Sequence, residues 1–288
     1  MGDKILIEHL DFQVGGGGTN SAVSFKRQGF KTAYLGKIGE DLNGVRVYSY
    51  LKKEGVDFIG SLGKENGFSV ILDSVADDRT ILNYKGCSND LHYSEINKSL
   101  LSTKWFYFSS MLEESFKTMK KLAFYASKNN IKIAFNPSIY QASQGINVLK
   151  SILDKTDLLI FNKEESQALS GEEDVKKVLK RLKKYVKGFI VITDGKRGAL
   201  LYDGKHVYEG KPSPDIKVVE TTGAGDAFAS ALTGAFIDGD SVTKAMKKGF
   251  IQAEAVIQSY GAKSNLLSKS ELLKKVRLDK RKITKKKI

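Results

Sequence analysis

The sequence predicts an α/β fold in which a mostly parallel central sheet lies between layers of helices. From residue 105 to residue 193, short apolar runs alternate with longer segments that have the character of helices. The runs WFYFS, LLIF and FIVIT are apolar almost throughout, which is typical of strands buried on both faces of a parallel sheet. The middle of the chain therefore reads as a series of strand–helix units.

The expected strands are apolar segments bounded by turn-forming residues. Residues 4–14 alternate loosely between apolar and polar types, so a strand or a bent pair is expected there. Ala76, Asp77 and Asp78 suit a hairpin between the segments at 68–73 and 80–84. These early segments do not fit the parallel pattern, and we expect them to form a small separate sheet that covers the site. The remaining strands are expected at 31–38, 105–109, 132–136, 158–161, 189–193, 199–203 and 217–219.

The expected helices have capping or stop residues at their ends, or an apolar stripe along one side. Thr19 is placed to cap a helix that Gly29 ends, and Gly55 ends the next one. In the segment 172–186, apolar residues recur at helical spacing and lysines occupy the exposed face. The helices are expected at 20–28, 42–54, 115–128, 148–154, 164–169, 172–186, 225–237, 241–259 and 270–276.

The composition excludes several classes of protein. The 288 residues are 41 % hydrophobic, which excludes a disordered chain. A single cysteine, Cys87, rules out an internal disulfide and a multi-cysteine zinc site, and the three histidines argue against a His-rich metal site. No apolar run approaches the ~20 residues of a membrane span, and the charged N-terminus does not resemble a secretory signal. We therefore expect a cytoplasmic protein.

The net charge of +14 is concentrated at the C-terminus. Residues 274–288 contain nine basic residues and one acid, a net charge of +8. We interpret this segment as the solvated, frayed end of a helix, with a flexible arm that contacts nucleic acid as the alternative. The expected organisation is one domain at 1–273, with lid strands near 4–14 and 67–88, followed by the basic tail at 274–288.

The segment ETTGAGDAF at 220–228 carries the strongest chemical signal. Gly223, Ala224 and Gly225 leave backbone N–H groups uncovered at the start of a helix, where the positive end of the helix dipole favours an anion. Asp226, in the first turn, could accept a proton from a hydroxyl that attacks a phosphoryl group. A glycine turn with Asp226 as a favourable charge at the helix start explains the segment equally well when it is taken alone.

The segment VGGGGTN at 14–20 is a second glycine-rich turn before a helix. A dinucleotide fingerprint that starts at Gly15 needs glycine at position 20, where Asn20 stands, so a dinucleotide-dependent oxidoreductase is disfavoured. The glycines permit close approach of a ligand, and the Asn20 amide suits a polyol hydroxyl. The alternative is a flexible turn in which Asn20 caps the helix.

Two further polar segments follow expected strands, at the sheet edge where α/β proteins bind ligands. Asn162 and Glu165 could hold a hydrated Mg²⁺, and a helix start stabilised by acids explains them at least as well. In TDGKRG at 193–198, Lys196 or backbone amides could meet nucleotide phosphates. A plain hairpin turn is the alternative for this segment.

In combination, the four segments resemble the ribokinase-like (PfkB) family of carbohydrate kinases. GGGGTNSAVSFKRQGFKTAYLGKIGEDLNG at 15–44 resembles the first family signature, ETTGAGDAF resembles the second, and Asn162 and Glu165 match an N-x-x-E motif. The resemblance covers nearly the whole chain in the expected order. It implies a three-layer α/β/α fold with a small β-lid, and an ATP-dependent kinase that phosphorylates a hydroxymethyl oxygen of a sugar or nucleoside.

The resemblance also implies a role for each matching residue. Asp226 would be the general base, and the glycine turn before it would be the anion hole. The implied set is Gly223, Ala224 and Gly225 for the anion hole, Asn162 and Glu165 for the Mg²⁺–phosphate region, Thr193, Gly195, Lys196 and Gly198 for ATP, and Gly15, Gly16 and Asn20 for the sugar.

Two departures from the family pattern affect these expectations. Glu220 stands where the family usually has an aspartate that helps to bind an activating monovalent cation, so K⁺ dependence is open. Met1-Gly2-Asp3 aligns with the segment just after the first core strand of the family, so that strand is expected to be missing. The alternative function is a ribokinase-fold binding protein with impaired catalysis that contacts nucleic acid through its basic tail.

The identity of the sugar or nucleoside stays open, because the family sets specificity through the lid and the first strand. The expected partners are a small-molecule substrate and a second copy of the chain bound through the lid, with no membrane and no nucleic acid. Candidate specificity residues in or near the second lid segment are Asp78, Arg79, Asn83, Lys85 and Asn89.

Overall fold

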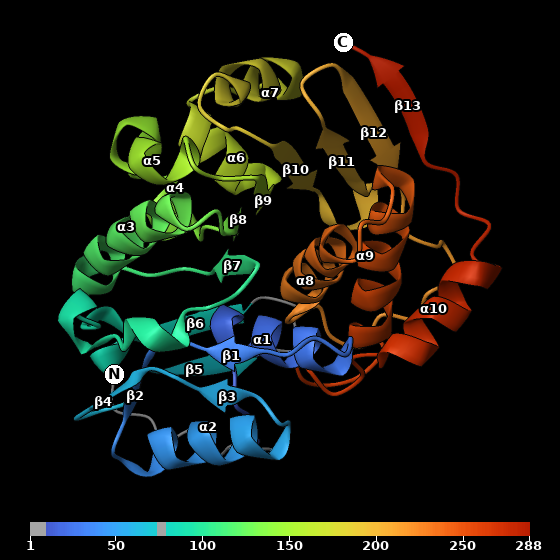
Figure 1. Cartoon of the computed structure of the whole chain (residues 1–288). Coiled ribbons are helices and arrows are strands. Elements are labelled where there is room, and N and C mark those ends of the chain that lie inside the picture. The colour runs from blue at the N-terminus through green and yellow to red at the C-terminus, as the bar shows by residue number, and fades with distance from the viewer. Residues whose placement is uncertain (1–9, 74–78) are drawn as a thin grey trace, which may run out of the picture.

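The computed structural model describes residues 10–73 and 79–288, and a seven-stranded sheet forms its centre (Figure 1). The strands are β7 (Trp105–Phe108), β8 (Lys132–Phe135), β9 (Leu158–Asn162), β10 (Phe189–Thr193), β11 (Ala199–Tyr202), β12 (His206–Gly210) and β13 (Thr284–Lys287). Their order is β13-β12-β11-β10-β9-β8-β7. Neighbours from β7 to β10 pair in parallel, whereas β11, β12 and β13 add antiparallel pairs at one side. The mostly parallel α/β architecture is therefore confirmed.

Strand β9 shows why its sequence is a continuous apolar run. Leu159 and Phe161 belong to the core on one face of the sheet, whereas Leu158 and Ile160 belong to the core on the other. All four side chains are at most 1 % exposed. Because successive side chains of a strand point to opposite faces, burial of both faces requires an apolar residue at every position.

Helices cover both faces of the sheet (Figure 1). One face packs against Met119 and Leu122 of α3 and Val178 of α7, and the other against Phe228 and Leu232 of α8. The helices of the fold are α1 (Gly17–Arg27), α2 (Leu42–Lys53), α3 (Glu113–Lys128), α4 (Ile139–Ala142), α5 (Gly145–Leu153), α6 (Lys163–Ser170), α7 (Val175–Lys183), α8 (Ala224–Ile237), α9 (Val242–Val256) and α10 (Lys269–Leu278). In the described part of the chain, none of the helices has the length and apolar character to cross a membrane.

A smaller group of strands, called the lid here, lies beside α1 and β7 together with α2 (Figure 1). Its longest unit is the antiparallel hairpin of β5 and β6, which confirms the predicted hairpin, although its turn at 76–78 lies outside the described residues. The predicted strand at 31–38 is two short strands, each paired in parallel with a later one. The lid strands are β1 (Ala33–Tyr34), β2 (Lys37–Gly39), β3 (Asp57–Phe58), β4 (Ser61–Gly63), β5 (Phe68–Asp73) and β6 (Arg79–Tyr84).

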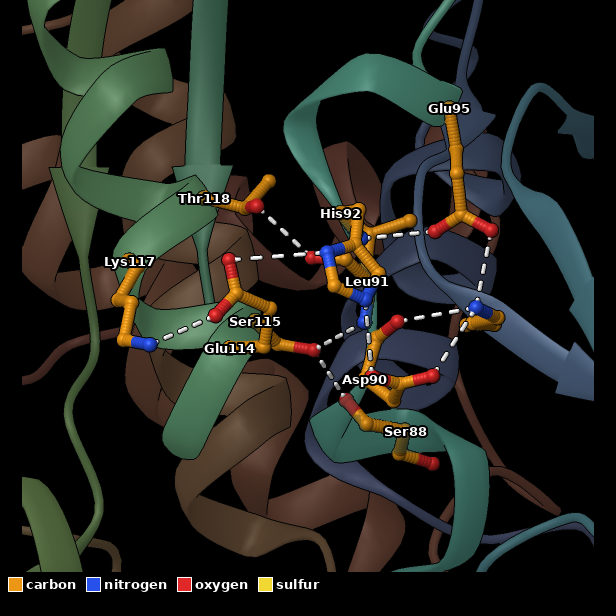
Figure 2. A network of polar contacts seen from close by, with 10 residues as sticks. Ser88, Asp90, Leu91, His92, Glu95, Glu114, Ser115, Lys117 and Thr118 are labelled. Carbon is orange, nitrogen blue, oxygen red and sulfur yellow. Dashed lines mark hydrogen bonds and ion pairs between the residues drawn. The ribbon is translucent and has the colours of Figure 1, made fainter.

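A polar network ties the lid to α3 through the segment that follows β6 (Figure 2). The ammonium group of Lys37 on β2 forms ion pairs with Glu95 at 2.9 Å and Asp90 at 3.3 Å. The same segment is held on the side of α3, where Ser115 Oγ accepts from Leu91 N and Thr118 Oγ donates to Leu91 O. Because Lys37 is buried, its charge would be strongly destabilising without these two ion pairs.

The first helix begins earlier than predicted. Helix α1 starts at Gly17, inside the glycine run, and Gly16 precedes it with a φ of +92°. The hydroxyl of Thr19 donates to Gly15 O and Gly16 O, so Thr19 lies within the first turn and does not cap the helix. Only glycine adopts the conformation of Gly16 without strain, and this lets the chain enter the helix at an angle.

Two predicted strands are corrected by the structure. Residues 217–219 form no strand, because Val219 N donates to Ile257 O at the end of α9 instead of to a neighbouring strand. The part of the 4–14 strand that the structure describes, residues 10–14, is also irregular, and residues 4–9 lie outside the described range.

The end of the chain is neither a frayed helix nor a loose arm. Strand β13 pairs antiparallel with β12 and completes the edge of the central sheet. Just before it, the buried side chain of Arg281 donates to both carboxylate oxygens of Glu254 on α9, at 2.8 and 2.9 Å. The basic C-terminal segment is thus part of the fold, and its lysines line an edge strand, where charge discourages pairing with other chains.

Replacing Arg281 with methionine is expected to lower the free energy of unfolding by about 3–5 kcal/mol, because Glu254 is left as a buried, unpaired carboxylate. Urea unfolding measures the loss. Lys286→Met is the control, since it removes an exposed pair with Glu209 that is worth under ~1 kcal/mol. Equal losses in the two variants would show that the Arg281 pair does not anchor the C-terminal segment.

Candidate active site

A cavity of about 200 Å³ opens where the carboxyl ends of β8, β9 and β10 meet the start of α8. This is the edge of a parallel sheet at which α/β proteins bind ligands. Three of the four predicted segments contribute to it, since residues from 162–165, 193–198 and 220–228 all line it. Its lining residues are Asn136, Ile160, Phe161, Asn162, Glu165, Thr193, Gly223, Gly225 and Asp226.

The start of α8 faces this cavity with uncovered backbone groups. Gly223, at the N-cap, has a left-handed φ of +80° and carries no side chain over the helix start. The N–H of Ala224 donates to Thr221 O at 3.2 Å, and for Gly223 and Gly225 the structure has no such backbone partner among the described residues. The positive end of the helix dipole and these N–H groups together suit an anion.

Asp226 lies in the first turn of α8, half-buried at the edge of the cavity. One carboxylate oxygen, Oδ2, accepts from Asn20 Nδ2 at 2.7 Å. Burial raises the pKa of Asp226 above its ordinary value, while the Asn20 hydrogen bond and the charge of Lys263 oppose the rise. A carboxylate in this setting is a stronger proton acceptor than an exposed one, because water solvates its charge less well.

Asn162 and Glu165 reach the cavity from the start of α6, where they also cap the helix. Asn162 Oδ1 accepts from Glu165 N at 2.8 Å, and Glu165 Oε2 accepts from Asn162 N at 2.9 Å. The predicted helix-start role is therefore present together with a place in the cavity wall. Burial raises the pKa of Glu165, and nearby Asp226 adds to the rise. Two carboxylates beside one cavity form a donor set that fits a hydrated divalent cation.

The segment at 193–198 is divided between the cavity and a turn. Thr193 ends β10 beside Asn162 and lines the cavity. Gly195, Lys196 and Gly198 form the turn between β10 and β11, outside the lining of the cavity, and the turn is that of a hairpin. A side chain at Gly198 would meet Gly210 O at 2.1 Å, so this glycine is required for close packing of the hairpin.

The backbone of the first glycine run also lies close to Asp226. A Cβ atom on Gly17 would lie 3.2 Å from Asp226 Oδ1, so the backbone of α1 passes close to the carboxylate. Gly15 and Gly16 precede this point, and neither lines the cavity. The amide of Asn20 is buried and engaged within the protein, with Nδ2 on Asp226 and Oδ1 accepting from Lys263 Nζ at 2.6 Å.

Glu220 precedes the glycine turn and braces it against the segment after α9. Its Oε2 accepts from Gly261 N at 2.8 Å. The next residue along that segment, Ala262, packs directly under Gly223. Glu220 therefore supports the turn from behind, and it does not belong to the cavity lining.

Sequence reasoning missed two polar residues at the site. Asn136, directly after β8, lines the cavity while its Nδ2 donates to Ile160 O at 2.8 Å. The position of Asn136 directly after an apolar run could have predicted its place at the site, because ligands of α/β proteins bind at the carboxyl ends of strands. Lys263 offered no such signal, since it comes from an irregular segment far along the chain.

Of the candidate specificity residues of the lid, Asn83, Lys85 and Asn89 lie apart from the cavity wall. Asn89 Nδ2 donates to Glu113 Oε1 at 3.1 Å, and Lys85 lies over the ring of Tyr140. Asn83 faces solvent on β6. Asp78 and the side chain of Arg79 are outside the described part of the chain.

Comparison with known protein families matches the pfkB family carbohydrate kinase over residues 2–269. The chain belongs to this family. The predicted resemblance is thereby confirmed, and the protein is an enzyme, a carbohydrate kinase of this family. The cavity and the two signatures therefore belong to a pfkB-family kinase.

Relatives of this kinase include a sugar kinase of Archaeoglobus fulgidus, 26 % identical over 252 residues, which cover 85 % of this chain and 98 % of the relative. The ribokinase of Lactococcus lactis is 25 % identical over 96 % of this chain and 90 % of its own. A putative ribokinase II of E. coli, solved in complex with ATP and Mg²⁺, matches with a TM-score of 0.82 over 96 % of this chain and 94 % of its own, at 16 % identity. These likenesses confirm the ribokinase-like fold.

Gly223→Ala is expected to destabilise the kinase by about 2 kcal/mol or more, because a left-handed φ strains alanine and its Cβ would lie 2.6 Å from Ala262. Gly225→Ala is the matched control, since its Cβ meets no atom within 4 Å and alanine favours helix. Thermal unfolding measures both. Equal melting temperatures in the two variants would contradict the packing assigned to Gly223.

Proposed function

We propose that this kinase transfers the γ-phosphoryl group of ATP to a hydroxymethyl oxygen of a sugar, a sugar-like molecule or a nucleoside, with Asp226 as the general base. The observation that carries the proposal is the position of Asp226, whose carboxylate lines the cavity one residue beyond the uncovered N–H groups of the glycine turn. A proton acceptor and an anion site thus lie side by side, which is what an attack by a hydroxyl on a phosphoryl group requires.

The chemistry assigned to the chain's own residues is simple. Asp226 accepts the hydroxyl proton while the hydroxyl oxygen bonds to the γ-phosphorus, and the bond from that phosphorus to the bridging oxygen breaks to release ADP. The N–H groups of Gly223 and Gly225 face the charge that develops on the transferred group, and Ala224 holds the turn through Thr221. Burial of Asp226 strengthens it as a base by raising its pKa.

The cation and the nucleotide are assigned to the neighbouring wall. Glu165 uses only one carboxylate oxygen in its helix cap, so the other is left for Mg²⁺ or a water on it, beside Asn162. When bound, the cation would offset phosphate charge. Thr193 is assigned to the nucleotide in the cavity, with Gly195, Lys196 and Gly198 on the turn next to it. Glu220 is assigned a monovalent cation such as K⁺ behind the glycine turn.

The sugar is assigned to the side of the cavity nearest α1. Gly15 and Gly16 would offer backbone groups, and Asn20 keeps one amide hydrogen beyond the one it gives to Asp226. In this arrangement Asn20 contacts both the base and the substrate. Its buried position makes it a fixed element of the site.

Asp226→Asn is expected to lower kcat by ~10²–10⁴, because the amide cannot accept the hydroxyl proton. ATP consumption is measured with a panel of sugars and nucleosides as acceptors. Asp238→Asn is the matched control, since it makes the same change at the far end of α8, where Asp238 pairs with Lys248. Wild-type turnover in Asp226→Asn would remove Asp226 from the proposed role.

The lid hairpin supports a proposal about assembly, in which two copies of the kinase pair through it. One face of the hairpin presents side chains that alternate along both strands and are each 43–57 % exposed, namely Phe68, Val70, Leu72, Leu82 and Tyr84. A continuous apolar face of this kind usually marks an interface. A self-complementary contact between two hairpins covers it on both copies at once.

Leu82→Asp is expected to convert the wild-type dimer to a monomer, because it places a charge in the centre of this apolar face. Sedimentation velocity gives the mass of each form. Leu278→Asp, on the exposed end of α10, is the control and is expected to stay dimeric. A monomeric wild type would contradict the proposed assembly.

A further inference from the structure

Lys263 is a buried cation that reaches the proposed base through one intermediate residue. It is 5 % exposed, and its ammonium group donates to Asn20 Oδ1 at 2.6 Å and to the carbonyl oxygen of Val14. Asn20 in turn donates from Nδ2 to Asp226 Oδ2 at 2.7 Å. The three side chains form a chain of hydrogen bonds from the segment after α9, through α1, to the start of α8.

The surroundings of Lys263 differ from those of the other buried lysines. Lys37 and Lys248 are both buried, and each forms ion pairs with two carboxylates within 3.3 Å. Lys263 has no carboxylate within 4.0 Å among the described residues, although it lies over the ring of Tyr50. Burial lowers its pKa to about 8, opposed by the charges of Asp226 and Glu54. A buried ammonium without an ion pair is costly to the fold, so an apolar residue would serve stability better.

The hydrogen-bonding capacity of lysine explains what Lys263 does to Asn20. An ammonium group only donates, so the amide atom that faces it must be the carbonyl oxygen. The NH₂ group of Asn20 is then turned toward Asp226, whose carboxylate only accepts. With the amide reversed, two donors would face each other at Lys263 and two acceptors at Asp226.

We propose that Lys263 is a positioning residue for phosphoryl transfer: it locks the Asn20 amide in the orientation that holds the Asp226 carboxylate ready to accept the substrate proton. The hydrogen bond to Val14 O also fixes the backbone just before the glycine run. The same ammonium group therefore holds both the side chain of Asn20 and the segment that leads into its helix. The inference rests on the proposed role of Asp226 as the base. It adds a residue that neither family signature contains.

Loss of Lys263 removes the group that distinguishes the two amide orientations. Asn20 then rotates, and Asp226 loses a fixed hydrogen bond on one oxygen. Small displacements of a catalytic group reduce rates strongly, and we expect kcat to fall roughly 10-fold or more with little change in the KM for ATP. The effect passes through Asn20, so it disappears when Asn20 is already absent.

A double-mutant cycle tests this route. Lys263→Met, Asn20→Ala and the double variant are compared with wild type by kcat, and the double variant is expected to be no slower than Asn20→Ala alone. Lys248→Met is the matched control, because it removes a buried lysine of α9 that pairs with Asp238 and Asp240 beyond the far end of α8, and it is expected to lower stability without lowering kcat. Losses that multiply in the double variant would overturn the inference.

A second measurement keeps the test independent of turnover. Hydrogen exchange of the Asn20 side-chain NH₂ is followed by NMR, with its signals assigned by their absence in Asn20→Ala. Slow exchange in wild type and fast exchange in folded Lys263→Met are expected. Unchanged exchange in Lys263→Met would overturn the positioning role even if every candidate acceptor fails, whereas absent turnover with the expected exchange would count against the proposed function alone.

Discussion

The close packing of α1 against α8 is the contact on which the site depends. Ser230 Oγ donates to Ser24 Oγ at 2.7 Å, and Asn20 donates to Asp226 one turn further along, although each pair is 206 residues apart in the chain. Small residues on α8 make this approach possible, since a Cβ at Gly234 would meet Gln28 Oε1 at 2.5 Å. Because the two helices approach closely, their polar side chains hydrogen-bond to each other directly. Asp226, the proposed base, is therefore held in place by contacts between a helix near the start of the sequence and a helix about 200 residues later.

Two glycines of the family signatures, Gly17 and Gly223, are required for packing inside the protein. A side chain at Gly17 would meet Ser109 Oγ at 2.7 Å, and one at Gly223 would meet Ala262. Gly225 differs, because its Cβ would enter open space beside the cavity. The same residue type thus closes the protein around Asp226 at two positions and keeps room for a ligand at a third, and only the structure separates these roles.

The parts of the fold that follow from local pattern were predictable. Strands such as β9 must be apolar at every position, and the apolar stripe of α7 marks its buried side. Strand β13 was not predictable, because an edge strand of lysines carries no apolar alternation. At the site, Asp226 could be found from the glycine turn before it, whereas Lys263 acquires its role only through contacts with residues about 240 positions away. Asn162 and Glu165 show that a helix cap and a cavity wall can be the same residues, so the two interpretations of that segment did not exclude each other.

The balance of charge around the cavity explains how these parts work together. Asp226 and Glu165 both line it, the charge of Asp226 adds to the rise in the pKa of Glu165, and the ammonium of Lys263 lies on the far side of Asn20. Two carboxylates repel the phosphates of a nucleotide, and in the proposed reaction a bound cation would offset part of this repulsion. In the proposed reaction, the N–H groups at the start of α8 attract one phosphoryl group without adding a proton donor that could neutralise Asp226. The positive charge of Lys263 opposes the rise in the pKa of Asp226, and the Asn20 amide between the two groups keeps them from forming a direct ion pair that would weaken the base.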